Sequence, residues 1–130
     1  MATRASIKFK DSDGKFIANV YHHYDGYPSG LGVRLLELTE GKTVNGINQI
    51  DATERTFNGF GCLAASVIEG LKDGVGGVYL YSEDEYGNVG EEYLYEVVEV
   101  DDGCQVLVSS IYGNDEFVPV EIVLETVKNN

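Results

Sequence analysis

The densest group of chemically active side chains in this chain lies at residues 21–30, whose sequence is YHHYDGYPSG. The stretch holds both histidines of the protein, His22 and His23, together with three tyrosines and the carboxylate of Asp25. Imidazole and carboxylate groups transfer protons or bind metals, and tyrosine rings offer flat faces to a planar ligand. The residue types and their spacing therefore indicate a ligand site.

The elements around this stretch would place it at a junction between a strand and a helix. Residues 15–21 have the composition of a strand, and Pro28 suits the first turn of a helix. Backbone N–H groups at a helix start can bind an anion, and Arg34, one turn further on, could assist them. We therefore predict a ligand pocket lined by Tyr21, His23, Asp25, Tyr27, Ser29, Gly30 and Arg34.

Other interpretations of this stretch stay open. It is also typical of a structural turn, in which Asp25 or Ser29 caps the helix and the glycines let the helix pack against the sheet. His23 and Asp25 could bind a metal, but no third ligand lies at a suitable spacing, so we expect no metal and no cofactor. The chain has no G-x-S-x-G motif and no His-paired cysteine motif, so we expect no catalytic residues.

The length and composition suit one globular domain spanning residues 1–130, since 43% of the residues are hydrophobic. No apolar run approaches the roughly 20 residues that cross a bilayer, and the N-terminus has no hydrophobic block typical of a signal peptide. We therefore expect a cytoplasmic protein with no membrane partner. Cys62 and Cys104 lack metal-ligand spacing, so we expect two free, buried thiols, with a disulfide between them as the alternative.

Acidic residues are concentrated in the second half of the chain. Residues 1–75 hold nine Asp or Glu and eight Lys or Arg, whereas residues 76–130 hold thirteen Asp or Glu and only Lys128. The second half would repel phosphates, so we expect no direct binding of nucleic acid. Two interpretations stay open: a solvated acidic face, or a surface that docks onto a basic partner as a nucleic-acid mimic would.

The apolar pattern predicts a hairpin followed by two helices. Residues 5–10 alternate between apolar and polar side chains, a turn follows at residues 11–14, and residues 15–21 form the returning strand. The first helix begins at Pro28 and buries leucines at positions 31, 35 and 38. The second covers Phe60–Leu71, whose apolar residues are spaced by three and four.

Residues 42–57, between the two helices, are predicted to form a long loop with a short helical turn at residues 52–56. From residue 75 the pattern favours strands at residues 77–82, 92–100, 105–111 and 117–123, separated by turns that contain glycine. Tyr79, Tyr81, Tyr93 and Tyr95 would share one face of the first hairpin of this meander. The predicted fold class is α+β: a single domain with a mostly antiparallel sheet, built from an N-terminal hairpin and a C-terminal meander, and two helices on one face.

The N-terminal part of the chain resembles a known group of proteins. Thr3-Arg4 leads into the first strand, and the later segment is Tyr21-x-His23-x-Asp25-Gly26-Tyr27-Pro28-x-Gly30-x-Gly32. It is similar to a set of small bacteriophage and prophage proteins that begin with a "TR" strand and share a DGYPxGxG core. This resemblance implies a phage or prophage origin, and it implies no particular activity.

These features lead to one functional hypothesis and two alternatives. In the leading hypothesis, a non-enzymatic phage accessory protein counters defence in the cytoplasm of the bacterial host, where it binds and sequesters a nucleotide-like host immune signal. The alternative is an acidic protein that blocks a basic surface of a host defence protein. The third hypothesis is an enzyme that acts on a small molecule. A homo-oligomer is compatible with each of them.

Overall fold

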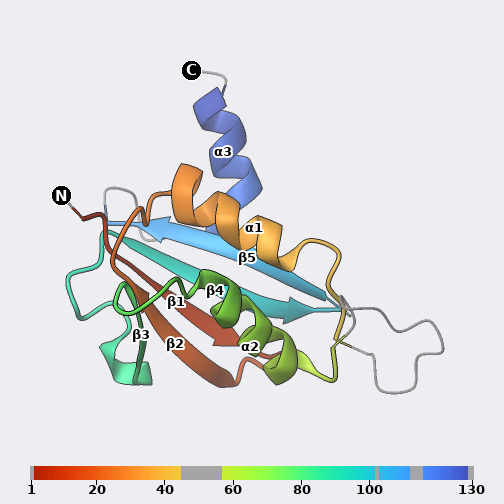
Figure 1. The fold of residues 1–130 in the computed structure, drawn as a ribbon. Helices are drawn as coiled ribbons and strands as arrows, with labels where there is room; N and C mark the ends of the chain where they lie inside the picture. The colour runs from red at the N-terminus through yellow and green to blue at the C-terminus, as the bar shows by residue number, and fades with distance from the viewer. Residues whose placement is uncertain (1, 45–56, 102, 112–115, 129–130) are drawn as a thin grey trace.

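The computed structural model describes residues 2–44, 57–101, 103–111 and 116–128. They form one six-stranded sheet in the order β3-β2-β1-β4-β5-β6, and α1 and α2 cross the same face of it (Figure 1). This architecture confirms the predicted α+β class with a mostly antiparallel sheet. The helical turn predicted at residues 52–56 lies outside the described residues.

The N-terminal hairpin forms where the sequence pattern places it, with β1 at Ala5–Lys10 and β2 at Phe16–His22. Asp11 holds the turn, because its Oδ1 accepts the N–H groups of Asp13 and Lys15, each at 2.9 Å. The apolar side of the β1 alternation is fully buried against the helices and consists of Ala5, Ile7 and Phe9.

The remaining strands join the hairpin from both sides. On one side β3 (Val78–Tyr81) pairs antiparallel with β2. On the other side β4 (Tyr93–Val100) pairs in parallel with β1, and β5 (Gly103–Ser110) and β6 (Val118–Pro119) continue the sheet antiparallel. The predicted C-terminal meander is therefore β4-β5-β6, and β3 belongs to the hairpin side.

The prediction that Tyr79, Tyr81, Tyr93 and Tyr95 share one face of a hairpin is wrong. Tyr79 is opposite Tyr21, which is opposite Ser6, on the sheet face away from the helices. Tyr95 is opposite the buried Ile7, on the helix side. The cause is the segment between the strands: residues 82–92 form a short helical turn, η2 (Glu83–Glu85), and a loop held by the buried carboxylate of Glu91.

The two predicted helices are present, and each buries its apolar stripe. A wide helical turn, η1 (Pro28–Gly32), runs directly into α1 (Val33–Thr39), and the α1 segment buries Leu35 completely. The second helix, α2, occupies Phe60–Leu71 as predicted, with Leu63 and Val67 fully buried and Ile68 only partly buried.

The segment predicted as a strand at residues 117–123 is instead a two-residue strand followed by a third helix, α3 (Val120–Lys128). The valines of this segment favour a strand locally, but Pro119 has no N–H for a longer ladder. Val120 is fully buried, and Val123 and Leu124 pack against the core at the three- and four-residue spacing of a helix. Tertiary packing therefore overrides the local β propensity.

Candidate functional site

The segment at residues 25–32 forms a tight turn whose helix-start amides are engaged. Asp25 has a φ of 54°. The N–H of Leu31 donates to the Asp25 carbonyl and that of Gly30 to the Tyr27 carbonyl, each at 2.9 Å. No side chain caps this helix, so the predicted capping by Asp25 or Ser29 is wrong. Because backbone carbonyls satisfy these two amides, neither is available to an anion.

The glycines of the turn are required by close packing. A Cβ at Gly26 would lie 2.8 Å from the Ala5 Cβ and 2.8 Å from the Thr3 carbonyl oxygen. A Cβ at Gly30 would lie 2.7 Å from the Asp25 carbonyl oxygen. Such distances are well inside van der Waals contact. The glycines therefore support the structural-turn interpretation of this motif.

Tyr21 and His23 lie together on the sheet face away from the helices. The Tyr21 hydroxyl lies 2.8 Å from Nδ1 of His23. The Tyr21 ring stacks on the Tyr81 ring, with centroids 5.2 Å apart and an interplanar angle of 8°. Tyr21 is only 7% exposed, and burial raises the pKa of its phenol. The flat face of Tyr21 is thus already occupied, whereas Tyr79, beside it, is 46% exposed.

Arg34 is engaged on the helix side. One guanidinium nitrogen donates to the Gly70 carbonyl at 3.2 Å, and another lies 3.5 Å from a carboxylate oxygen of Glu37. Asp25, Gly30 and Arg34 line a hollow of about 260 Å³ together with His22. The Nδ1 of His22 is buried with no hydrogen-bond partner among the described residues, and burial lowers the pKa of this imidazole.

The structure thus distributes the seven predicted site residues over several places. Tyr21 and His23 form a pair on the open sheet face, and Asp25, Gly30 and Arg34 share the small hollow with His22. The exposed Tyr27 hydroxyl donates to Asp25 at 3.3 Å, and this carboxylate raises the pKa of Tyr27. Ser29 lines a different and larger groove. A ligand-binding role for these residues stays a prediction.

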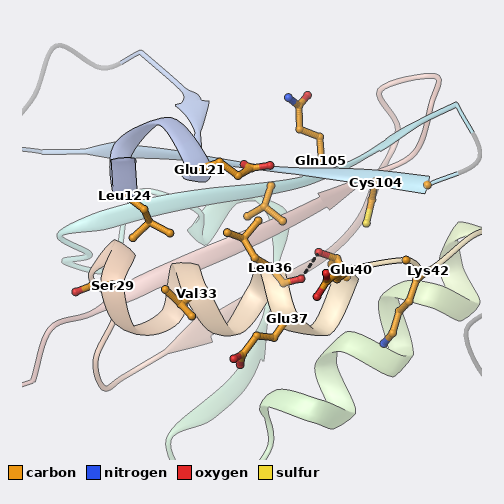
Figure 2. Close-up of a pocket in the computed structure, with 14 residues that line it drawn as sticks. Ser29, Val33, Leu36, Glu37, Glu40, Lys42, Cys104, Gln105, Glu121 and Leu124 are labelled. Carbon is orange, nitrogen blue, oxygen red and sulfur yellow. Dashed lines mark hydrogen bonds between the residues drawn. The ribbon is translucent and has the colours of Figure 1, made fainter. Parts of the chain in front are cut away.

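The larger groove has a volume of about 770 Å³ and lies between α1, β5 and α3 (Figure 2). Sequence reasoning missed it because its third wall, α3, was predicted to be a strand. The signal that could have indicated an amphipathic helix is the spacing of Val120, Val123 and Leu124 by three and four residues, with Glu121 and Glu125 four residues apart. The groove lining consists of Ser29, Val33, Leu36, Glu37, Thr39, Glu40, Gly41, Lys42, Gly103, Cys104, Gln105, Val106, Glu121 and Leu124.

The groove combines apolar walls with an acidic margin. Leu36 of α1, Leu124 of α3 and the thiol of Cys104 lie inside it, and Glu37 and Glu121 lie on opposite sides of it (Figure 2). Its lining holds three glutamates and one lysine. The Lys42 ammonium group donates to the Ser66 hydroxyl at 3.1 Å, toward α2. The groove therefore suits a ligand that is both apolar and positively charged.

The groove has little of what a catalytic site needs. Burial raises the pKa of the Cys104 thiol, which leaves it less nucleophilic at neutral pH. Cys62, predicted to be buried, is exposed, and both cysteines are free. Among the described residues, no three His, Cys, Asp or Glu side chains are grouped closely enough to hold a metal.

Comparisons with models of protein families, with curated proteins and with solved structures find no significant match to this chain. In the part of the chain that the structure describes, no helix has both the length and the apolar character of a membrane span.

Proposed function

We propose that this protein is a binding module whose α1–β5–α3 groove holds a basic, amphipathic segment of another protein. The single observation that carries this proposal is the groove itself, in which apolar side chains lie between glutamates of α1 and α3. A segment with one apolar face and flanking lysines or arginines would bury its apolar side chains there and place its charges near the acidic margins.

The charge of the whole chain supports the same ligand class. The net charge is −13, and residues 76–130, which supply β5 and α3, contribute −12 of it. Such a field attracts a basic partner at long range and raises its rate of association. This proposal develops the hypothesis of an acidic protein that blocks a basic surface. With the resemblance to phage proteins, it extends to a host defence protein as the partner.

Sequestration of a nucleotide-like signal is a second proposal. The observation that favours it is the small hollow in which Arg34, the unpartnered Nδ1 of His22 and Gly30 meet. Two observations count against it: Arg34 already contacts Glu37 and the Gly70 carbonyl, and the carboxylate of Asp25 lines the same hollow.

The test of the groove uses labelled synthetic peptides and fluorescence anisotropy. The first peptide has leucines at helical spacing and lysines on its other faces, the second replaces the leucines with serines, and the third replaces the lysines with glutamates. We expect only the first to bind tightly, because it alone supplies both the apolar face and the positive charge. Equal affinity for the first and second peptides would show that the apolar walls are not used.

Charge reversals locate the binding site on the protein. Glu37→Lys and Glu121→Lys place positive charge on two margins of the groove and should each weaken binding of the basic peptide several-fold. Asp73→Lys makes the same change in charge at an exposed position outside the groove lining and serves as the control. If all three variants lost the same affinity, binding would reflect net charge alone and the groove proposal would fail.

A further inference from the structure

The sheet has one edge that is open to another strand. At one edge of the sheet, the outermost strand is β6, which has only two residues, and one of them is Pro119. At the opposite edge, the outermost strand is β3, which has four residues. It carries large apolar side chains in solvent, with Leu80 70% exposed and Tyr79 46% exposed. A strand edge with exposed apolar side chains is a site for pairing with another chain.

The hydrogen bonds of β3 show which of its backbone groups point outward. The N–H of His23 donates to the Gly77 carbonyl, so these two residues form a hydrogen-bonded pair. Because such pairs alternate along an antiparallel ladder, Tyr79 and Tyr81 also direct their backbone groups toward β2, and Val78 and Leu80 direct theirs to the edge.

Only part of this edge is satisfied within the chain. The Nζ of Lys72 donates to the Val78 carbonyl at 3.3 Å and to the Gly76 carbonyl at 3.1 Å. At the far end of the strand, the N–H of Ser82 donates to Glu85 and its carbonyl accepts from Asn19. The outward N–H and C=O of Leu80 have no partner among the described residues. Within β3, Leu80 is therefore the residue whose outward N–H and C=O are both without a partner among the described residues, since the Val78 carbonyl accepts from Lys72.

We propose that two copies of this chain pair through β3, antiparallel, about a two-fold axis that passes beside Leu80. A two-fold axis places Leu80 of one copy opposite Leu80 of the other copy. The N–H of each Leu80 would then donate to the carbonyl of the other, which gives two backbone hydrogen bonds. In a register centred on Tyr79, Leu80 would pair with Val78, whose carbonyl already accepts from Lys72, so the register centred on Leu80 is preferred.

The side chains suit this register. Opposed residues in an antiparallel pair point to the same face, so the exposed Leu80 side chains of the two copies would meet on the helix side. There they adjoin a mostly apolar hollow of about 570 Å³ between α2 and β3, lined by Ala65, Ile68, Glu69, Lys72, Val78, Tyr79 and Leu80. On the other face, Tyr79 of each copy would lie opposite Tyr81 of the other and extend the row of stacked tyrosines.

Charge also favours a second copy. In this register Ser82 of one copy lies opposite Val78 of the other, so the acidic turn η2, at Glu83–Glu85, continues toward Lys72 of the other copy. The two-fold axis produces this contact twice. The lining of the hollow between α2 and β3 holds one acid and one base, Glu69 and Lys72. The lining of this hollow is therefore neutral in a chain whose net charge is −13.

The test is the molecular mass in solution, measured by sedimentation equilibrium from micromolar to millimolar protein. We expect a reversible dimer for the parent and a monomer for Leu80→Lys, since two like charges would face each other across the axis. Ile122→Lys, which makes the same kind of change at an exposed apolar residue of α3, should remain dimeric. A parent that is monomeric throughout, or a Leu80→Lys variant that dimerises like the parent, would overturn the proposal.

A cross-link fixes the register and covers the case in which Leu80→Lys fails to fold. A Leu80→Cys variant in a Cys62→Ser background should be trapped as a dimer by oxidation or by a short bis-maleimide, because opposed Cα atoms lie about 5.5 Å apart. Val75→Cys, at a fully exposed position ahead of β3, should cross-link far less. Equal cross-linking of the two variants would exclude the register centred on Leu80. The proposed groove lies elsewhere, so this result leaves the proposed function untouched.

Discussion

The phenol hydroxyl of Tyr95 donates a 2.7 Å hydrogen bond to the carbonyl oxygen of Gly26. Both residues are buried, so this contact joins the middle of β4 to the turn that leads into α1. Burial raises the pKa of the Tyr95 phenol, which keeps it protonated as a donor. The bond explains how the turn is held against the sheet although no side chain caps the helix.

We expect Tyr95→Phe to lower the free energy of unfolding by about 1–3 kcal/mol, because the Gly26 carbonyl would be left buried without its donor. Urea denaturation measures this change. Tyr93→Phe is the matched control, since the Tyr93 hydroxyl has no hydrogen-bond partner among the described residues and this variant should melt nearly as the parent does. Equal losses in the two variants would mean that the bond to Gly26 contributes nothing specific.

Two glycine substitutions should have opposite effects on stability. Gly26→Ala should destabilise the protein by about 1–3 kcal/mol, because its Cβ would clash with the Ala5 Cβ and the Thr3 carbonyl. Gly61→Ala, in the exposed part of α2 with no atom near its Cβ, should stabilise it by roughly 0.5–1 kcal/mol through helix propensity. Thermal melts of both variants test the pair. A neutral Gly26→Ala would show that the turn can shift away from β1.

The carboxylate of Glu91 should be essential to the loop over the open sheet face. It is 6% exposed. Its Oε2 accepts hydrogen bonds from the Ser6 hydroxyl at 2.6 Å and the Gly87 N–H at 2.7 Å, and its Oε1 accepts one from the Val89 N–H at 2.9 Å. In Glu91→Gln an amide N–H₂ would face at least one of these donors, so we expect a loss of about 1–3 kcal/mol.

The control for this variant is Glu92→Gln, which removes the same charge from the next residue, whose side chain makes no hydrogen bond among the described residues. Hydrogen exchange of the Gly87 and Val89 amides adds a local measurement. Both amides should exchange faster in Glu91→Gln than in the parent. Unchanged protection would contradict the role given to this carboxylate.

His22 should make the protein less stable as the pH falls below the ordinary histidine range. Burial lowers the pKa of its imidazole from the usual value of 6.5. The unfolded chain therefore takes up a proton at a higher pH than the folded one does. Above pH 6.5, His22 is neutral in both states and folding carries no protonation penalty at this residue. Stability is lost as the pH falls from 6.5 through the pKa of His22 in the folded protein.

Urea unfolding of the parent and of His22→Gln across this pH range tests the linkage. The parent should lose more stability than the variant on going from above pH 6.5 to below it, because glutamine does not titrate. Parallel stability curves for the two proteins would show that His22 has the same pKa in the folded and unfolded chains.

The elements that the sequence predicts well are those whose pattern is complete within one segment. The alternation of residues 5–10 and the Asp11 turn are sufficient for the hairpin, and the spacing of Leu63 and Val67 is sufficient for α2. The pairing of β1 with β4 depends on contacts between distant segments, and no local pattern encodes it. In α3, the β-branched valines pointed to a strand, and only the burial of Val120 against the core decides for a helix.

The candidate site was harder to predict for the same reason. The Tyr21–Gly30 stretch attracts attention by its residue types, but the structure divides its side chains between the two faces of the sheet. The groove is assembled from Leu36, Cys104 and Leu124, three ordinary residues that are far apart in the sequence. The groove forms because α3 packs beside α1 and β5, and the sequence pattern had predicted a strand in place of α3.

The parallel pair between β1 and β4 has a consequence for biosynthesis. Residues 5–10 leave the ribosome long before residues 93–98, with which they pair. At typical translation rates, β1 of the amino-terminal hairpin remains without its partner strand β4 for several seconds. Throughout that interval the nascent hairpin exposes a row of unsatisfied main-chain groups, flanked by the positive charges of Lys8 and Lys10. The sheet is thus completed late in synthesis, and chaperones can bind the nascent chain before that point.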